Sequence, residues 1–336
     1  MQIAIIATEG SMMSAVTGLA DMFWITNQSL PAGEGDFPHP RFDTAIVSAD
    51  GMPVRDAQGR TIPVDHAFAS VPTPDIVLAC GMALGADRLP ARPINMAADW
   101  LREQYRRGAL IGGACAGGYM LGEAGLLDGK ACATTWWLYP TFRQRYPRAK
   151  MVWGKPLIED GNIITTGGPL SWADLALHII RRQAGKEAAR IAADMAVADS
   201  QPLSQQLYAP RGFLNAIDPM LLRAEQLIRY DNPAITVEQL ASALNLSPRT
   251  LHRKLAGLTQ ESPRHFITRV RIESACLLLE NPTANIRHIA AACGYSEDTA
   301  FRKAFVQLMG MTPAQYKRWV ASRNGTQPRV DPQGEQ

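Results

Sequence analysis

The chain has few cysteines, and none of them lie at a metal-binding spacing. No C-x-x-C motif occurs, the six histidines are scattered, and the five cysteines are Cys80, Cys115, Cys132, Cys276 and Cys293. Zinc sites need several such ligands at short, regular spacings. A glycine-rich phosphate loop is also missing. We therefore expect reduced thiols, no metal and no cofactor.

Long hydrophobic runs are missing too. No apolar run approaches the roughly 20 residues of a membrane span. The first residues, MQIAIIATEG, lack the basic start and the cleavage site of a signal peptide. They predict a first β-strand instead. We expect a cytoplasmic protein without a membrane partner.

The first two thirds of the chain lack an excess of either charge. Residues 1–214 contain 19 Lys and Arg against 20 Asp and Glu, whereas residues 215–325 contain 14 against 9. The basic balance of the C-terminal third favours a polyanionic partner for that part of the chain alone.

Short apolar runs alternate with helical patterns in the N-terminal part. The 336 residues leave room for about two domains. The alternation is typical of an α/β doubly wound parallel sheet, and the segment around Gln58-Gly59 predicts a hairpin beside it. The predicted strands are 3–7, 44–49, 75–80, 109–115, 131–135 and 162–168; the predicted helices are 12–28, 94–107, 116–124 and 171–184.

The pattern changes from about residue 200 to 215, and no strand is predicted after this segment. We predict an α/β domain at 1–190, a linker at 191–216, an all-α domain at 217–322 and a disordered tail at 323–336. The predicted helices of the all-α domain open on residues that favour helix starts. These are Asp218, Thr236, Ser247, Ser262, Ser296 and Thr312.

The all-α domain contains a weak internal repeat. The segment TVEQLASALNLSPRTLHRKL is similar to NIRHIAAACGYSEDTAFRKAF, and each predicts two helices joined by a short turn, through Asn245 in one and Gly294 in the other. Two helices joined in this way form a helix-turn-helix unit. The repeat predicts two such units in tandem.

Residues 236–319 resemble the DNA-binding domain of the AraC/XylS regulators. The resemblance rests on LA..L.LSPRTL.RKL (240–255), SP..FI...RI..A..LLE (262–280) and I..IA..CGYS....F.KAF....G.TPAQY (286–316). It implies a double-stranded DNA operator, with the second helix of each unit in a major groove.

The resemblance also implies which side chains face DNA. On the first recognition helix Arg249, His252 and Arg253 share one face, opposite Leu251 and Leu255, which face the core. On the second, Phe301 and Phe305 are expected to point inward, while the outward residues are Asp298, Thr299, Arg302 and Lys303. Asp298 replaces the usual neutral residue, and it either accepts a hydrogen bond from cytosine N4 or caps the helix start.

The N-terminal part resembles the ThiJ/PfpI group, which is related to the class I glutamine amidotransferases. GACAGGYMLGEAGLLDGKACATT carries the resemblance, which implies an amidotransferase-like, flavodoxin-like fold. Cys115 takes the position of the nucleophile on a strand-to-helix turn, where a helix N-terminus favours a thiolate. The amides of Ala116 and Gly81 are expected to form an oxyanion hole.

The base expected beside that cysteine is missing. Trp136 stands where the relatives have a histidine, and Ala15 where they often have a glutamate. Glu9 is close in sequence, but it either reaches the cysteine or sits at a helix start. His66 and His178 are not obvious substitutes. We therefore expect a mildly reactive thiol and a non-catalytic domain.

Tryptophans are concentrated in the N-terminal part. Trp136 and Trp137 follow the strand predicted beside Cys115, and Trp172 lies at another strand-to-helix turn, at the edge where ligands bind to such sheets. Aromatic faces suit cationic groups, so an amine, amino acid or betaine is one expected effector, with Asp174 or Glu123 as the opposing charge. The alternative is that these rings pack in the core or in a dimer interface.

The two resemblances together imply a GlxA-type transcriptional regulator of the AraC/XylS family. We expect a homodimeric activator that binds an operator, a small-molecule effector and RNA polymerase. Two alternatives stay open: a cysteine-dependent amidase or hydratase fused to a DNA-binding domain, and a redox sensor that uses Cys115, with Cys132 or Cys80 as a neighbouring thiol.

Overall fold

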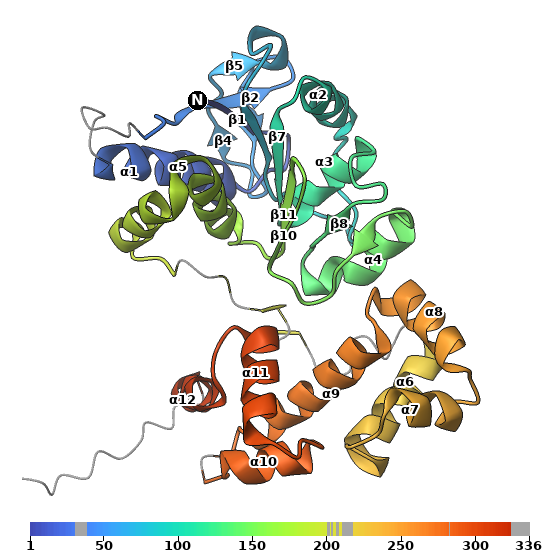
Figure 1. Ribbon diagram of the computed structural model, residues 1–336. Coiled ribbons are helices and arrows are strands. Elements are labelled where there is room, and N and C mark those ends of the chain that lie inside the picture. Colours follow the sequence, from blue (N-terminus) through green and yellow to red (C-terminus); the bar gives the residue numbers. More distant parts are fainter. Residues whose placement is uncertain are drawn as a thin grey trace, which may run out of the picture. The chain divides into compact units, whose positions relative to one another are not determined.

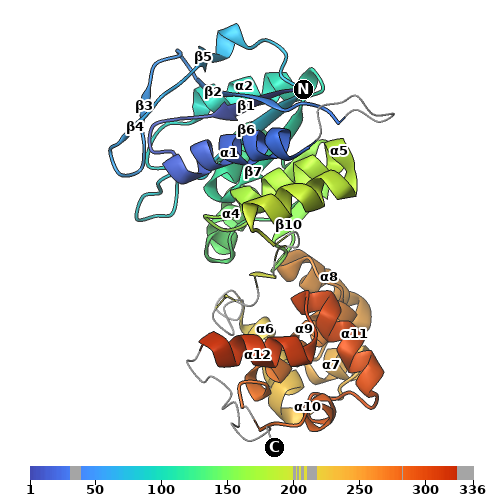
Figure 2. The same ribbon diagram turned by 90° about the vertical axis from the view of Figure 1, so that its left-hand side faces the viewer.

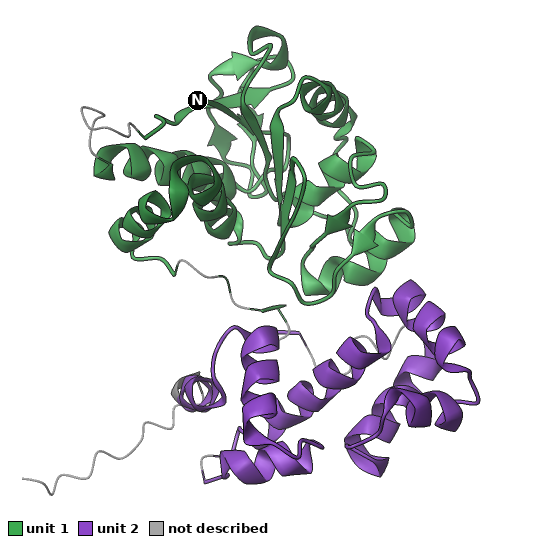
Figure 3. Ribbon diagram, viewed as in Figure 1, with its two compact units in different colours: residues 1–206 green, residues 207–336 purple. Residues whose placement is uncertain are grey.

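The computed structural model describes residues 1–30, 39–199, 202, 204–205, 208–209, 218–281 and 283–323. The chain divides into two compact units, unit 1 with residues 1–206 and unit 2 with residues 207–336 (Figure 3). No helix in the described ranges combines the length and the apolar character that a membrane crossing requires.

Unit 1 is built on a seven-stranded sheet, which confirms the predicted α/β class. The strand order is β10-β11-β7-β6-β1-β2-β5, and every pairing is parallel except that of β10 with β11. The strands are β1 Gln2–Ile6, β2 Asp43–Ser48, β5 His66–Ala67, β6 Ile76–Ala79, β7 Leu110–Ala114, β10 Leu157–Asp160 and β11 Ile163–Thr166.

Helices cover both faces of this sheet (Figure 1). α1 (Met13–Ser29) and α5 (Trp172–Ala196) lie side by side on one face, as Figures 1 and 2 both show. α2 (Asn95–Arg106) and α3 (Gly118–Glu123) lie on the other. The four central strands contribute buried apolar side chains to the core, as expected for a sheet covered on both faces.

Several short elements differ from the sequence-based expectations. The strand predicted at 131–135 is only β8 (Ala131–Cys132), which pairs with β9 (Lys150–Met151) outside the main sheet. The edge strand β10 and the helix α4 (Tyr139–Arg145) were not predicted. The hairpin is confirmed as β3 (Val54–Arg55) and β4 (Thr61–Ile62).

The end of unit 1 also differs from the prediction. α5 continues past residue 190 to Ala196, with a break in its helical backbone at Gly185, where φ is 91°. Ser204 and Gln205, placed in the predicted linker, are buried. Other linker positions, at 200–201, 203, 206–207 and 210–216, lie outside the described residues. Of the predicted tail, Arg323 ends α12, and residues 324–336 lie outside the described part.

Unit 2 is helical in its described ranges. One apolar core joins α6, α7, α8 and the start of α9, and a second joins the end of α9 with α10, α11 and α12. The helices are α6 Pro219–Gln226 with a π-helical turn Leu227–Asp231, α7 Val237–Ala243, α8 Pro248–Thr259, α9 Pro263–Leu278, α10 Ile286–Ala292, α11 Asp298–Met309 and α12 Pro313–Arg323.

The helix starts of unit 2 largely follow the predicted caps. The side chains of Asp218, Thr236, Ser247 and Ser262 each accept a backbone N–H of the helix that follows, and Thr312 does the same for α12. The start predicted at Ser296 is wrong, because the residue before α11 is Glu297, whose side chain caps nothing.

Candidate functional site

Cys115 lies on a sharp turn between a strand and a helix, as the sequence predicts. β7 ends at Ala114, a 3-10 turn spans Cys115–Gly117, and α3 follows. Cys115 has a φ of 52°, in the left-handed region that residues with a Cβ avoid. The turn also requires Gly117, because a Cβ there would lie 2.1 Å from the carbonyl oxygen of Ala79.

The Cys115 thiol is deeply buried, with 5% of the residue exposed. Burial raises the pKa of Cys115 to about 11, although the N–H groups of Ala116 and Gly168 and the Thr135 side chain hydrogen-bond to the sulfur. The thiol is therefore protonated at neutral pH. The direction of this pKa shift is opposite to the one that a helix N-terminus favours, because desolvation outweighs the nearby N–H groups. The reactivity of the thiol stays a prediction.

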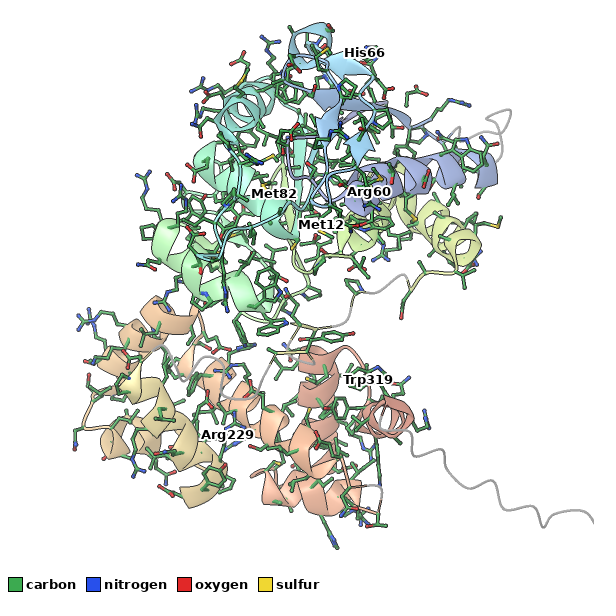
Figure 4. The ribbon with its side chains drawn as sticks, turned by 180° about the vertical axis from the view of Figure 1, so that it is seen from behind. Met12, Arg60, His66, Met82, Arg229 and Trp319 are labelled. Carbon is green, nitrogen blue, oxygen red and sulfur yellow. The ribbon has the colours of Figure 1, made fainter. Side chains whose placement is uncertain are left out.

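The side chains considered as bases either bond to other groups or lie away from Cys115. The Glu9 carboxylate accepts the backbone N–H of Arg55 at 3.1 Å. His178 lies 2.5 Å from the Glu159 carboxylate. Figure 4 shows His66 in unit 1 at the opposite end from Met12, which bonds the Gly81 carbonyl near Cys115. Ala15 is buried in the core.

The two amides predicted as an oxyanion hole both lie at the turn. The Ala116 N–H hydrogen-bonds to the sulfur of Cys115. A Cβ on Gly81 would come 3.7 Å from the Cβ of Cys115, so the two residues are neighbours. The role of these amides in binding a ligand stays a prediction.

The tryptophans have different surroundings. Trp136 and Trp137 are half-buried and begin the 3-10 turn Trp136–Leu138. The Trp172 ring packs against α1, where it leaves no room for a Cβ on Gly18, and it borders the core of unit 1. The ring thus packs as the alternative predicts, but its buried indole N–H has no hydrogen-bond partner among the described residues. A role of Trp172 in ligand binding stays a prediction.

The two carboxylates considered as counter-charges also differ. The Glu123 carboxylate accepts hydrogen bonds from Tyr146 and Arg145; burial raises its pKa, but these two bonds lower it. Its charge is already paired, so it is not free for a cationic ligand. Burial and the nearby charge of Asp199 raise the pKa of Asp174 to about 6. No group of three His, Cys, Asp or Glu suited to a metal occurs in the described ranges.

Gln205, which no sequence pattern singled out, is buried in unit 1. Its side-chain oxygen accepts the Trp136 N–H at 2.9 Å, and its side-chain nitrogen donates to the Thr134 carbonyl at 2.8 Å and the Lys155 carbonyl at 2.9 Å. The surrounding sequence, with prolines and glutamines, has no periodicity that could reveal this position.

The first helix-turn-helix unit has the predicted geometry. α7 and α8 are joined through Asn245, which adopts a left-handed φ of 56°. Leu251 and Leu255 are completely buried. The predicted DNA-facing residues of α8, Arg249, His252 and Arg253, are all exposed. No ion pair involves these two arginines among the residues described.

The second unit repeats this arrangement in α10 and α11. Gly294 takes the turn position with a φ of 79°, and Phe301 and Phe305 are completely buried. The outward residues Thr299, Arg302 and Lys303 are exposed.

Asp298 does not cap α11, and only one of its two carboxylate oxygens is engaged, since Oδ1 is buried without a hydrogen-bond partner among the described residues. It is the first residue of the helix, and its Oδ2 accepts the Arg302 Nε–H at 2.6 Å. This pair at a spacing of four residues lies on the predicted DNA-facing side, so the Arg302 charge is partly neutralised there. The proposed cap is therefore wrong, because the carboxylate turns along the helix towards the arginine.

A buried network of charged side chains connects α6 and its π-helical turn to α9. The Arg269 side chain, on α9, is 1% exposed and pairs with Glu261 at 3.0 Å and Glu273 at 2.7 Å. Arg229, which Figure 4 shows among these helices, pairs with Glu225 at 3.0 Å and also with Glu273. Removal of one partner from such a network leaves an uncompensated buried charge, so the network fixes how α6 and α9 pack.

Two family models match separate parts of the chain, and one relative matches most of its length. The DJ-1/PfpI family matches residues 35–182, and the Helix-turn-helix domain family matches residues 240–318. The chain is 28% identical over 270 residues to the HTH-type transcriptional regulator GbdR of Pseudomonas aeruginosa, a match that covers 80% of this chain and 72% of GbdR.

Two further relatives are a transcriptional regulator and an enzyme. The chain is 27% identical over 221 residues to the HTH-type transcriptional regulator GlxA of Rhizobium meliloti, covering 65% of this chain and 68% of GlxA. It is 29% identical over 156 residues to an isonitrile hydratase of Pseudomonas putida, covering 45% of this chain and 64% of the hydratase.

Proposed function

Because the chain belongs to the AraC-type transcriptional regulators that carry a DJ-1/PfpI domain, we propose that α8 and α11 bind an operator in adjacent major grooves while unit 1 senses a small metabolite. The observation that carries the proposal is the repeated pair of helices. In each pair the second helix, α8 or α11, has a buried apolar side and an exposed side with basic residues. On double-stranded DNA, two recognition helices that lie in adjacent major grooves contact sites about 34 Å apart.

DNA selection tests the first half of this proposal. The full-length protein is used to enrich sequences from a randomised duplex pool, and the bound positions are mapped by footprinting. We expect two short protected blocks about one helical turn apart. A single block, or no enrichment over the starting pool, contradicts binding by both units.

We propose that unit 1 binds its metabolite without converting it. The protonated thiol of Cys115 and the engagement of Glu9 and His178 elsewhere support this. The alternative, a hydratase-like activity, has support from the partial similarity to an isonitrile hydratase. A redox role for Cys115 also stays open, but deep burial limits access of an oxidant.

The pH dependence of the Cys115 alkylation rate distinguishes a non-catalytic thiol from the activated thiolate of an enzyme. For full-length protein with an otherwise cysteine-free sequence, we expect the Cys115 alkylation rate to rise about tenfold per pH unit between pH 7 and 9.5, because the thiolate fraction rises so below a pKa of about 11. A rate that is already at its plateau at pH 7 indicates an activated thiolate and favours the enzyme.

The effector is proposed to be an amine, an amino acid or a betaine. Half-buried Trp136 and Trp137 supply aromatic surface beside the turn. A panel of these compounds is tested by the melting temperature of full-length wild type and of Cys115→Ser. A compound that stabilises both proteins and is recovered unchanged supports a sensor; one that only wild type consumes makes unit 1 an enzyme.

We further propose a cytoplasmic homodimer that activates transcription through RNA polymerase. A ligand can switch such a protein only if it binds two states with different affinity. Sedimentation of the full-length protein tests the dimer, and transcription from a selected operator in vitro, with and without a stabilising compound, tests the direction of control. A monomer at micromolar concentration, or transcription that falls when the protein is added, contradicts this part.

A further inference from the structure

Among the described residues that follow α5, Gln205 is held to unit 1 by its side chain. It is 6% exposed, and its carboxamide makes three hydrogen bonds, one from the Trp136 N–H and two to the carbonyls of Thr134 and Lys155. Its own backbone N–H donates to the Gly154 carbonyl at 2.9 Å, and the neighbouring Ser204 hydroxyl donates to the same oxygen at 3.1 Å.

These partners define a subsite with a specific chemistry. One N–H and two C=O groups match a primary carboxamide, which has an oxygen acceptor and two N–H donors. A carboxylate in the same place would face two carbonyl oxygens, and a guanidinium would face the N–H with no acceptor. The fit is tight, since a Cβ on Gly167 would lie 2.1 Å from the Gln205 side-chain nitrogen.

The subsite is continuous with the surroundings of Cys115. Thr134 accepts from Gln205, while the next residue, Thr135, bonds to the Cys115 sulfur. Gly167 packs against the Gln205 carboxamide, while the next residue, Gly168, donates its N–H to the same sulfur. The two chain segments that hold the thiol therefore also hold Gln205.

We propose that unit 1 contains a primary-carboxamide subsite beside Cys115, and that Gln205 fills it in cis and so latches the segment leading to unit 2. An effector that presents a carboxamide to this subsite, or that moves residues 134–136 or 167–168, releases the latch. The inference deepens the proposed sensor function and rests on it for its regulatory meaning.

Release of the latch changes the reach of the connection. With Gln205 held, the residues between it and Asp218 are 206–217. If Ser204 and the Gln205 backbone N–H leave the Gly154 carbonyl together with the carboxamide, the connection runs from the end of α5 at Ala196 and comprises 197–217. A fully extended chain covers about 3.3–3.6 Å per residue, so the maximum reach rises from about 40 Å to about 70 Å.

Amide hydrogen exchange of the full-length protein tests the subsite. Gln205→Ala removes the acceptor of the Trp136 N–H and empties the subsite, while Gln144→Ala, an exposed position on α4, is the matched control. Exchange is followed at the Trp136 amide, with propionamide as the probe and propionate as its isosteric control.

We expect Trp136 to exchange at least tenfold faster in Gln205→Ala and unchanged in Gln144→Ala. Propionamide restores protection in Gln205→Ala, and propionate does not. Unchanged exchange at Trp136, or equal protection by propionamide and propionate, overturns the proposal. Because Gln205→Ala could also loosen α4, exchange at Phe142 provides a check; a change there that propionamide does not reverse counts against a local latch.

DNA binding of the same variants separates this inference from the proposed function. We expect Gln205→Ala to change the affinity for a selected operator at least threefold, whereas Gln144→Ala does not. An unchanged affinity overturns the coupling between latch and DNA binding. If neither wild type nor variant selects DNA while the Trp136 amide still responds to propionamide, the subsite stands and the proposed function fails.

Discussion

The two helix-turn-helix units share one backbone plan but differ in their turns, caps and charges. In the first, Asn245 makes the turn, Ser247 caps α8, and the arginines of α8 form no ion pair with any described residue. In the second, Gly294 makes the turn, α11 has no side-chain cap, and Arg302 is paired with Asp298.

The difference shows that the repeat conserves the core positions more strictly than the polar ones. Leu251 and Leu255 in the first unit correspond to Phe301 and Phe305 in the second, and all four are fully buried. The exposed side chains can vary because each lies in water and packs against little. We expect the first unit to contribute more to DNA affinity, since its cations do not have to leave a partner.

The largest effect is expected at the turn of the second unit. Gly294 has a φ of 79°, and an added Cβ would lie 2.1 Å from the Pro233 carbonyl oxygen. We expect Gly294→Ala to destabilise unit 2 by about 3–5 kcal/mol, because backbone strain and a clash with main chain add. Asn245→Gly, the matched change in the first unit, should stay within about 1 kcal/mol.

Hydrogen exchange of α10 and α11 in full-length protein measures this difference. Wild-type protection in Gly294→Ala would show that Pro233 moves aside at little cost, and the contrast between the two turns would disappear.

Arginine substitutions should separate the two recognition helices. Arg253→Ala is expected to weaken binding to a selected operator by about 1–3 kcal/mol and to relax base preference at one position. Arg302→Ala should cost less than about 1 kcal/mol, because its charge is already shared with Asp298. Binding is compared on the operator and on single-base variants of it. Equal loss on every sequence means that Arg253 contacts only phosphate.

The N-terminal caps of α8 and α11 are expected to give a smaller difference in stability between the two units. The Ser247 hydroxyl accepts the Thr250 N–H at 3.2 Å. Ser247→Ala is expected to lower the stability of unit 2 by about 1 kcal/mol, because it leaves this N–H without its acceptor. Glu297→Ala is the control before α11, where no cap exists, and should stay within about 0.5 kcal/mol. Urea unfolding measures both, and equal losses would contradict the assigned difference in capping.

The smallest effect is expected at Asp298. Asp298→Asn keeps the shape of the side chain but removes the charge beside Arg302. We expect DNA binding a few-fold tighter, with the slope of log affinity against log salt steeper by up to about 0.9, as for one more phosphate contact. The DNA-binding titration is repeated at several salt concentrations between about 50 mM and 200 mM. Weaker binding would instead indicate that Asp298 contacts a base.

Several local features could be predicted from the sequence, whereas the pairing of one strand could not. The turn at Cys115, the caps at Thr236 and Ser247 and the buried faces of α8 and α11 all follow from patterns within a few residues. The strand at 131–135 was predicted too long, because its apolar residues pack beside β9 rather than in the main sheet. A local pattern cannot reveal which sheet a strand joins.

The sequence by itself determined the two-part architecture, the tandem helix-turn-helix units and the position of a cysteine on a strand-to-helix turn. These depend on short-range periodicity, capping and backbone preference. Tertiary structure decided that the Cys115 thiol stays protonated and that Gln205 fills a subsite beside it. The reason is that burial and hydrogen bonding there join distant residues, such as Gln205 and Thr134, which are 71 positions apart.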